Sequence, residues 1–260
     1  MIGILANQKG GVAKTTNTIH LAAALAKNGY KTLVIDFDSQ CDASHSVNVR
    51  NTGDTYNIVN FLDDDENFKL KQRAPNFFIL PGSIDFVSNK YPKNILKTRL
   101  YQKRENDMCF NDYFDFIFID CPPSKIIVSD KRFEYSEIEL ALFAADFFLI
   151  PLMADDFSIK NANTFLGKVS YFTDKNNIDI NFLGFFFGCV LVTSNSKEYY
   201  TNMFLQHSNK LLLKTFIRQD TEVKKAVQLG KTIFQHKPNC RASEDYVNLS
   251  NEFLNILTDG

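Results

Sequence analysis

The sequence predicts an α/β protein built on a doubly wound, mostly parallel sheet with helices on both faces. Two observations lead to this prediction: short apolar runs recur along the 260 residues, and helical patterns separate many of them. Continuous apolar runs are typical of strands buried on both faces, and their alternation with helices indicates crossover connections. No linker divides the chain, so we expect one domain over residues 1–260, large enough to bury a core.

The elements follow in order from these patterns. The expected strands are Ile2–Ala6, Thr32–Ile35, Phe77–Leu80, Phe114–Ile119, Phe147–Pro151, Phe182–Val192 and Leu211–Ile217. The expected helices are Thr16–Lys27, Glu134–Ala144, Ser158–Thr173, Tyr199–Ser208, Thr221–Leu229 and Ser243–Leu257. Residues 41–75 and 86–108 are polar and predict surface helices or loops, and the acidic run Asp63–Glu66 is typical of a solvated face.

Composition and charge exclude several classes of protein. The formal net charge is −1, which excludes a generally basic nucleic-acid coat, so any DNA contact must come from a local patch. No uncharged run reaches membrane-spanning length, and the apolar start of the chain is too short for a signal peptide. The five cysteines have neither metal-ligand nor C-x-x-C spacing, which favours reduced thiols in the cytoplasm.

The most informative segment is the loop Gln8–Thr16, Gln-Lys-Gly-Gly-Val-Ala-Lys-Thr-Thr. It follows an expected strand and precedes an expected helix, which is the context of a phosphate-binding loop. Backbone N–H groups of such a loop converge on phosphate oxygens. Lys14 adds a positive charge near the β- and γ-phosphates, and the Thr15 hydroxyl is placed to bind Mg²⁺. The alternative is a glycine-rich turn without a ligand, which this density of glycine, lysine and threonine disfavours.

Aspartates end two of the expected strands. Asp36 and Asp38 follow the run that begins at Thr32, and Asp120 follows the run that begins at Phe114. Ligands of open α/β sheets bind beyond the carboxyl ends of the strands, so these carboxylates are expected near the nucleotide. Asp120 has the form of a Walker B carboxylate beside Mg²⁺. For an isolated aspartate, a turn or helix cap is the alternative.

The loop does not match the common G-x-x-x-x-G-K-[ST] pattern, because Gln8 and Ala13 stand at its glycine positions. It resembles the deviant form K-G-G-x-x-K-[ST], which has a second lysine, here Lys9, and marks the ParA/MinD family of ATPases. Further segments resemble the signatures of ParA/Soj-type partition ATPases in the same order: Asp36–Gln40, Asp120–Ser124, Phe148–Pro151 and, more weakly, Ile217–Ile233. The resemblance therefore spans nearly the whole chain.

The resemblance implies an ATPase that uses ATP and Mg²⁺, and it assigns roles to single residues. Lys14 is implied to be the Walker lysine, and Lys9 to reach the partner's nucleotide across an ATP-dependent homodimer. Asp38 is implied to position the attacking water. The implied nucleotide-binding residues are Lys9, Gly10, Gly11, Val12, Ala13, Lys14, Thr15 and Thr16, and the implied Mg²⁺-binding residues are Thr15, Asp38 and Asp120.

Three features depart from the family pattern. Ser39 replaces a proline, which is expected to loosen the segment that carries the catalytic aspartate. Ala13 replaces a glycine, and its Cβ is tolerable if the local φ is negative. The segment Lys125–Glu134 is longer than usual; its basic residues indicate either a functional contact or a solvated loop, and the loop is favoured.

Positive charge gathers in the C-terminal third of the chain. Between Lys197 and Arg241 there are nine Lys or Arg and three acidic residues, an excess of six positive charges. Such an asymmetry indicates either a nucleic-acid contact or scattered surface lysines. Family members without a separate DNA-reading domain bind DNA through basic residues in this region. The candidates for a DNA-binding patch are Lys197, Arg218, Lys224 and Lys225.

The leading hypothesis is a partition ATPase that dimerises on ATP, binds DNA non-specifically on the nucleoid, and is released when a centromere-binding ParB-like adaptor stimulates hydrolysis. A MinD-like ATPase acting at a membrane, or another ParA-like ATPase that positions a protein complex, is the alternative. A membrane-bound form would need a basic amphipathic C-terminal helix, and residues 248–260 contain no Lys or Arg. An iron–sulfur reductase with a similar loop would need a second suitably placed cysteine besides Cys121.

Overall fold

The computed structural model describes residues 1–50, 55–65, 70–104, 107–127, 134–192, 202 and 211–259. Its centre is a seven-stranded sheet of order β3-β4-β2-β5-β1-β6-β7. All neighbouring strands are parallel except β3 and β4, which pair antiparallel. The predicted doubly wound, mostly parallel α/β fold is confirmed.

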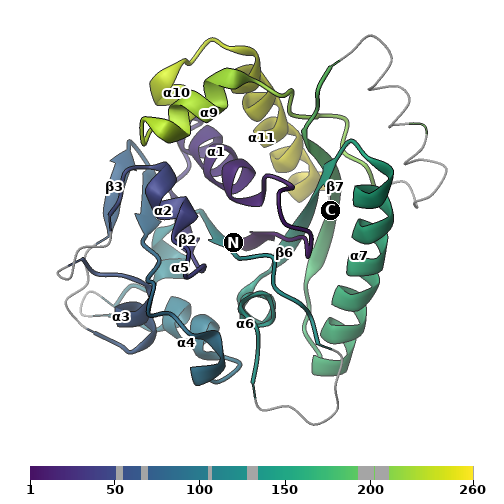
Figure 1. The fold of residues 1–260 in the computed structure, drawn as a ribbon. Helices are drawn as coiled ribbons and strands as arrows, with labels where there is room; N and C mark the ends of the chain where they lie inside the picture. The colour runs from purple at the N-terminus through teal and green to yellow at the C-terminus, as the bar shows by residue number, and fades with distance from the viewer. Residues whose placement is uncertain are drawn as a thin grey trace.

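The strands are β1 Ile2–Leu5, β2 Thr32–Asp36, β3 Lys71–Ala74, β4 Phe77–Leu80, β5 Phe116–Asp120, β6 Phe147–Met153 and β7 Asn181–Cys189. The α-helices among the described residues are α1 Lys14–Lys27, α2 Asp42–Ser46, α3 Ile58–Leu62, α4 Ile95–Tyr101, α5 Phe110–Tyr113, α6 Glu137–Ala144, α7 Asp156–Asn176, α9 Thr221–Gln228, α10 Ile233–His236 and α11 Arg241–Asp259. A 3₁₀ turn, η1, spans Ser88–Lys90. The helices lie on both sides of the sheet (Figure 1).

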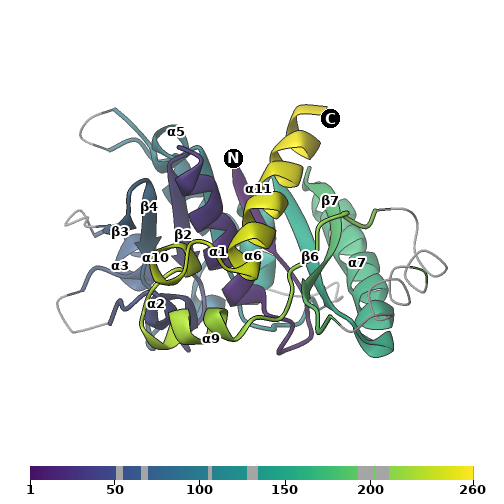
Figure 2. The ribbon, with the colours of Figure 1, turned by 90° about the horizontal axis from the view of Figure 1, so that it is seen from above.

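Alternate residues of the central strands enter two separate hydrophobic cores. On β2, Leu33 and Ile35 pack into the core that contains α3 to α7, whereas Val34 between them packs into the core that contains α1 and α11. This alternation follows from the two-residue period of a strand. Because both cores are apolar, the central strands are mostly hydrophobic. Figure 2 shows α9, α10 and α11 together with α1 on one side of the sheet.

The strands β1, β2 and β5 lie side by side at the centre, so their carboxyl ends meet at one edge. Their registers pair Ile4 with Ile119, and Asp36 with Asp120. The loop that follows β1 leads directly into α1, the helix that packs against α11. This topology places the glycine-rich loop and the strand-end aspartates at one site.

Two expectations for the sheet were wrong. The apolar run Leu211–Ile217 is not a continuous strand: it lies along the edge of β7 through two isolated bridges, Phe185 to Leu212 and Val190 to Arg218. Conversely, the polar segment 71–74 forms strand β3 at the opposite edge of the sheet. Edge strands tolerate charged side chains because one of their sides has no neighbouring strand. The expected helix Tyr199–Ser208 lies outside the described residues.

Within the acidic run, Asp63 is exposed, as a solvated face predicts, whereas Asp64 and Asp65 are half-buried; Glu66 lies outside the described residues. The Asp64 carboxylate lies 3.0 Å from the Arg99 guanidinium, and Asp63 accepts a hydrogen bond from the Tyr91 hydroxyl at 3.1 Å. These contacts connect the segment after α3 to α4 and to the turn before it. The run therefore has a structural role that the sequence pattern did not reveal.

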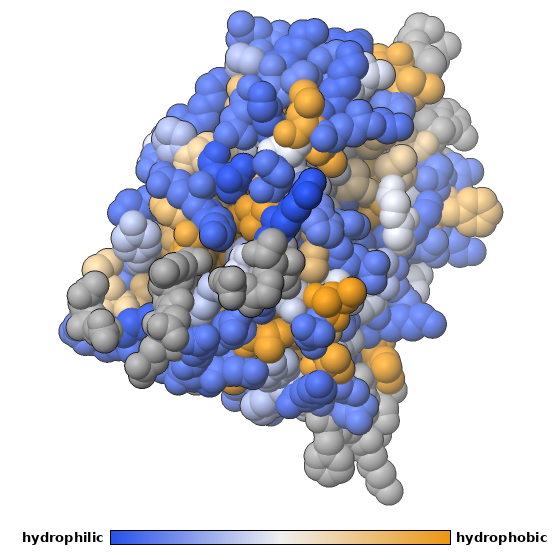
Figure 3. Space-filling view, turned by 60° about the vertical axis from the view of Figure 1, so that its left-hand side comes forward, coloured by the Kyte–Doolittle hydropathy of each residue, from blue (hydrophilic) through white to orange (hydrophobic). Residues whose placement is uncertain are grey.

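The surface is mostly hydrophilic. Figure 3, in which the left-hand side of Figure 1 comes forward, shows small separate hydrophobic areas among hydrophilic side chains. Single exposed apolar residues are normal for a globular protein. None of the helices within the described ranges has the length and the apolar character needed to cross a membrane.

Candidate active site

The phosphate-binding loop connects β1 to α1 with a backbone that favours glycine. Gly11 has a φ of 75°, and Ala13, the N-cap of α1, has a φ of 59°. The condition under which the Ala13 Cβ is tolerated without strain, a negative φ, is therefore not met. A side chain in the left-handed region costs roughly 1–2 kcal/mol, so the loop retains this conformation at a cost that glycine would avoid. The first residues of α1 follow at once, which leaves their N–H groups free of helical partners and available to an anion.

The two lysines of the loop lie in different environments. Lys14 is 7% exposed, and burial lowers its pKa, an effect partly offset by the charge of Asp120. Its Nζ donates to the backbone oxygen of Lys9 at 3.3 Å. Lys9 lies at the rim with a side chain that is 34% exposed, and its Nζ is 3.2 Å from Asp155 Oδ2. The structure therefore separates a buried lysine, Lys14, from a partly exposed one, Lys9, that is paired with Asp155.

Asp120 ends β5 inside the site. It is 1% exposed, and among the described residues neither of its carboxylate oxygens has a hydrogen-bond partner. Burial, reinforced by the nearby Asp36, raises its pKa to about 8, whereas the Thr15 hydroxyl and Lys14 lower it. A buried carboxyl without partners is costly. A divalent cation would supply the missing partner, and the Thr15 hydroxyl beside it is a suitable second oxygen ligand.

Asp36 and Asp38 differ in what they contact. Asp36 is fully buried and accepts hydrogen bonds from the Ser44 N–H at 2.8 Å and the Ser44 hydroxyl at 2.5 Å. Burial raises the pKa of Asp36 to about 6 even though these bonds oppose the shift. Ser44 in turn accepts from the Gly82 N–H at 3.0 Å. Asp36 therefore holds α2 and the loop after β4 at the sheet edge.

Asp38 lies just beyond β2 and is 9% exposed. Its Oδ1 accepts the Gln40 N–H at 2.9 Å, and its backbone oxygen accepts the Cys41 N–H at 3.0 Å. Burial raises its pKa, and the charge of Lys14 opposes that shift. Asp38 is thus close enough to Lys14 to interact electrostatically, which is the neighbourhood that a water-positioning carboxylate requires.

Two residues of the site were missed by sequence reasoning. Asn7 holds the loop: its side chain accepts the Lys9 N–H at 2.9 Å and donates to the Pro151 oxygen at 2.9 Å. Asp155 is the N-cap of α7 and accepts the Ser158 N–H at 2.7 Å while it pairs with Lys9. An Asp before a helical pattern was a recognisable capping signal, but no local pattern indicates a lysine 146 residues away as its partner.

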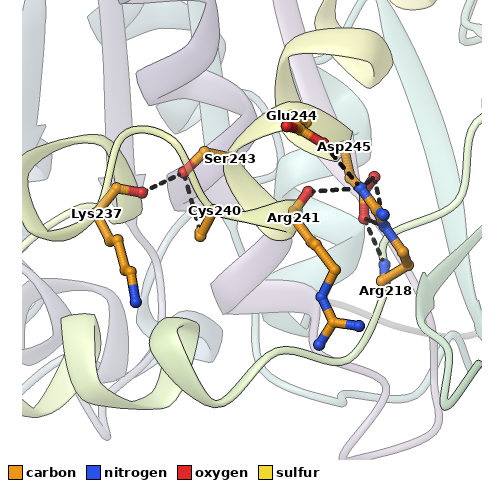
Figure 4. Close-up of polar contacts among 7 residues, drawn as sticks. All are labelled: Arg218, Lys237, Cys240, Arg241, Ser243, Glu244 and Asp245. Carbon is orange, nitrogen blue, oxygen red and sulfur yellow. Dashed lines mark hydrogen bonds and ion pairs between the residues drawn. The ribbon is translucent and has the colours of Figure 1, made fainter.

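The candidate DNA-binding residues do not share one environment. Figure 4 shows one of them, Arg218, with its partners. Arg218 donates from Nε and from one terminal guanidinium nitrogen to Asp245, at 2.7–3.0 Å, and it pairs with Glu244. Asp245 is 6% exposed, so Arg218 connects the segment after β7 to α11 and its charge is compensated. Lys225 pairs with Glu222 at 2.8 Å. Lys224 is exposed, and no described residue forms an ion pair with it. Lys197 lies outside the described residues.

A parallel sheet with a phosphate-binding loop after its first strand, a buried lysine and an unpartnered buried carboxylate define a P-loop nucleotide-binding protein. Residues 1–182 match the family model described as AAA domain, so the chain belongs to that family. The ParA/Soj resemblance is confirmed as well, and the chain is a ParA-like ATPase.

The relatives cover nearly the whole chain. A ParA family protein of Chlamydia pneumoniae is 29% identical over 262 residues, which is 96% of each chain. The chromosome-partitioning ATPase Soj of Treponema pallidum is 26% identical over 258 residues, again 96% of each chain. The fold is similar to that of cobyrinic acid a,c-diamide synthase from Mycobacterium smegmatis with bound ADP and magnesium: the TM-score is 0.76 at 21% identity, over 100% of this chain and 96% of that one. These comparisons support ATP and Mg²⁺ as the ligands of the site.

Proposed function

We propose that this ATPase partitions DNA: it dimerises on ATP, binds DNA without sequence preference, and is released when a centromere-binding, ParB-like adaptor stimulates hydrolysis. The observation that carries the proposal is the second lysine of the loop. Lys9 lies at the rim, where a second subunit could approach, whereas Lys14 already supplies the internal charge. The similarity to the chromosome-partitioning ATPase Soj of Treponema pallidum supports a partition role.

Different residues of the site have different roles in ATP hydrolysis. The loop N–H groups and Lys14 bind the phosphates and stabilise negative charge as it develops on the γ-phosphate. Thr15 and Asp120 would hold Mg²⁺, which when bound neutralises phosphate charge. Asp38 orients the attacking water, because its carboxylate lies beyond β2 on the same edge. Water then attacks the γ-phosphorus, the bond to the β-γ bridging oxygen breaks, and ADP and phosphate form.

Dimerisation requires a change of partner for Lys9. In the monomer its ammonium group is paired with Asp155 at 3.2 Å. Across a dimer, two γ-phosphates would face each other, and a lysine from each subunit would compensate for their repulsion. The side chains of Lys9 and Asp155 are partly exposed, at 34% and 41%. Their ion pair is therefore weak, and Lys9 can exchange Asp155 for a phosphate of the other subunit.

The DNA-binding surface that we propose is a basic face on α9 to α11, formed by Lys224, Lys225, Lys237 and Arg241. Glu222 offsets part of its charge, since it pairs with Lys225 at 2.8 Å and lies 3.7 Å from Lys237. In Figure 4 the side chains of Lys237 and Arg241 extend in the same direction, with Arg241 beside Arg218. Arg218 supports this face structurally rather than by its own charge. Lys197 remains a proposed contact outside the described residues. A dimer would present two such faces and bind with higher avidity.

The test is filter binding of random-sequence duplex DNA across a salt series, with and without a slowly hydrolysed ATP analogue. We expect binding that requires nucleotide, and a slope of log affinity against log salt that falls by about 1 for each phosphate contact removed. Lys224→Ala with Arg241→Ala should weaken binding to all sequences alike. Lys103→Ala is the control, since it removes an exposed lysine elsewhere, one that pairs with Asp107.

Absence of nucleotide-dependent DNA binding at low salt would contradict the partition proposal while leaving the ATPase intact. The alternative would then be a MinD-like or other ParA-like ATPase that positions a protein complex or acts at a membrane surface. Binding to anionic vesicles in place of DNA would favour the membrane form. For the partition function, we expect cytoplasmic protein associated with the nucleoid.

A further inference from the structure

The first turn of α6 contains a carboxylate that the nucleotide chemistry does not use. Glu139 is fully buried, although a buried carboxylate is costly unless hydrogen bonds satisfy it. Its Oε1 accepts the Ile127 N–H at 2.8 Å, and its Oε2 accepts the Ser136 N–H at 2.8 Å. One side chain therefore binds both ends of the chain segment that leads from the Walker B region to α6.

The same junction is fastened at two further points. The Ser136 hydroxyl donates to the Lys125 oxygen at 3.0 Å. The Ile138 N–H donates to the Ser124 hydroxyl at 3.2 Å. Residues 124–127 are thus held to the start of α6 by backbone and side-chain contacts on both sides. Glu139 differs from the other residues of this junction because its single side chain accepts two of the hydrogen bonds.

This junction borders the phosphate-binding loop. A Cβ placed on Gly10 would lie 3.9 Å from Pro123 Cγ, so the residue before Ser124 is the immediate neighbour of the loop. The Glu137 charge also raises the pKa of Asp38, although burial is the largest cause, which places the start of α6 near the proposed water-positioning carboxylate. A displacement of residues 124–127 would therefore change the surroundings of the phosphate-binding loop and of Asp38.

We propose that Glu139 is a positioning residue for ATP hydrolysis. Its two hydrogen bonds fix residues 124–127 against the loop, so that the segment after Asp120 is already placed when ATP binds. Preorganised groups accelerate a reaction because they need not reorganise during it, and small misplacements are costly in rate. Both N–H groups that Glu139 binds lie between Asp120 and α6 and not in the phosphate-binding loop, so it acts on turnover rather than on nucleotide affinity.

The test compares Glu139→Gln with Glu252→Gln. Glutamine keeps one acceptor oxygen but places an NH₂ group against the other N–H, so only one of the two bonds can form. Glu252 on α11 makes the same kind of bridge, to the Lys214 N–H at 2.7 Å and the Thr215 N–H at 2.8 Å, away from the loop. It therefore controls for the general loss of a bridging carboxylate.

We expect kcat of Glu139→Gln to fall about 10-fold or more, with the Kd for ATP within about 2-fold of wild type. Glu252→Gln should keep wild-type kcat even if its Tm falls. Both are measured at a temperature at which each variant is fully folded. Equal kcat in wild type and Glu139→Gln, or an equal loss in both variants, would overturn the proposal.

Ser136→Ala is the milder second variant if Glu139→Gln does not fold. It removes the bond to the Lys125 oxygen and should lower kcat about 2- to 3-fold; an unchanged kcat would count against the positioning role.

The inference rests on the ATPase activity and not on DNA binding. Wild type that hydrolyses ATP without binding DNA would contradict only the partition proposal, whereas wild type that binds ATP without hydrolysing it would overturn the positioning role too.

Discussion

Replacement of Asp120 by asparagine should stabilise the nucleotide-free protein and remove part of its pH dependence. The carboxyl is almost fully buried, and its two oxygens have no hydrogen-bond partner among the described residues. Burial and the neighbouring Asp36 raise its pKa from 3.8 to about 8. Asparagine has nearly the same shape but no charge to desolvate, so folding no longer requires this group to hold a proton.

The sign and size follow from proton linkage. The folded protein keeps the Asp120 proton up to about pH 8, whereas the unfolded chain loses it near 3.8. Stability therefore falls as pH rises between these values, by about 1.4 kcal/mol per pH unit. From about pH 6.5 to 8 the free energy of unfolding falls by about 2 kcal/mol. The fall is smaller than the full slope gives, because folded Asp120 itself begins to lose its proton near pH 8. At pH 7, Asp120→Asn should add about 2 to 4 kcal/mol to the free energy of unfolding.

Comparison of the two proteins isolates this group. Between about pH 6.5 and 8 the unfolded chain also releases protons from His20, whose pKa burial lowers from 6.5 to about 3, and from the N-terminus, whose pKa burial lowers from 8.0. Wild type and variant share both groups, so the difference between their slopes reports Asp120. Urea unfolding is measured at several pH values for wild type and Asp120→Asn. Asp42→Asn, at an exposed position near the site, is the control and should leave the wild-type profile unchanged.

An Asp120→Asn protein with the same slope of stability against pH as wild type between about pH 6.5 and 8 would refute the reasoning. Added Mg²⁺ and ATP supply a second check. A cation beside the carboxylate favours its charged form, so the wild-type slope should diminish with Mg²⁺ and nucleotide, and the variant should lose Mg²⁺-dependent ATP hydrolysis.

Three further perturbations test other parts of the site. Lys14→Ala should abolish ATP binding in a titration, and unchanged affinity would contradict the P-loop assignment. Ala13→Gly should raise the free energy of unfolding by about 1 kcal/mol because φ is 59°, whereas Ala24→Gly inside α1 should lower it by at least about 1 kcal/mol; equal signs would argue against strain. Asp155→Asn keeps the N-cap but removes the charge that holds Lys9, so ATP-dependent dimerisation by sizing should tighten about 2- to 5-fold; weaker dimerisation would argue against this exchange.

The ATP site could be predicted from the sequence because its parts are local. A glycine-rich loop between a strand and a helix exposes its own N–H groups, and parallel strands bring their carboxyl ends to one edge regardless of what lies elsewhere. Lys14, Asp38 and Asp120 were placed correctly at this edge by those two rules. The catalytic and Mg²⁺-binding roles assigned to them remain predictions.

The two wrong predictions about strands were made from hydrophobicity, which indicates whether a segment is buried but not whether it pairs with a neighbouring strand. The run 211–217 is apolar, but a strand also needs a continuous ladder of hydrogen bonds, and the edge of β7 offers only two isolated bridges. The opposite error occurred at β3, where charged residues hid an edge strand. Hydrophobicity indicates whether a segment is buried. Whether the segment forms a strand depends on the hydrogen bonds that it makes with the edge of the sheet.

By itself the sequence determined the class of fold, the phosphate-binding loop and the carboxylates at the strand ends, because each depends on neighbouring residues in the chain. Only the tertiary structure decided the partner of each charge. It paired Lys9 with Asp155 and Arg218 with Asp245, and among the described residues it left Asp120 without a partner. The free energy of a charge depends on the groups and solvent within a few ångströms, and folding brings most of those groups from distant parts of the chain.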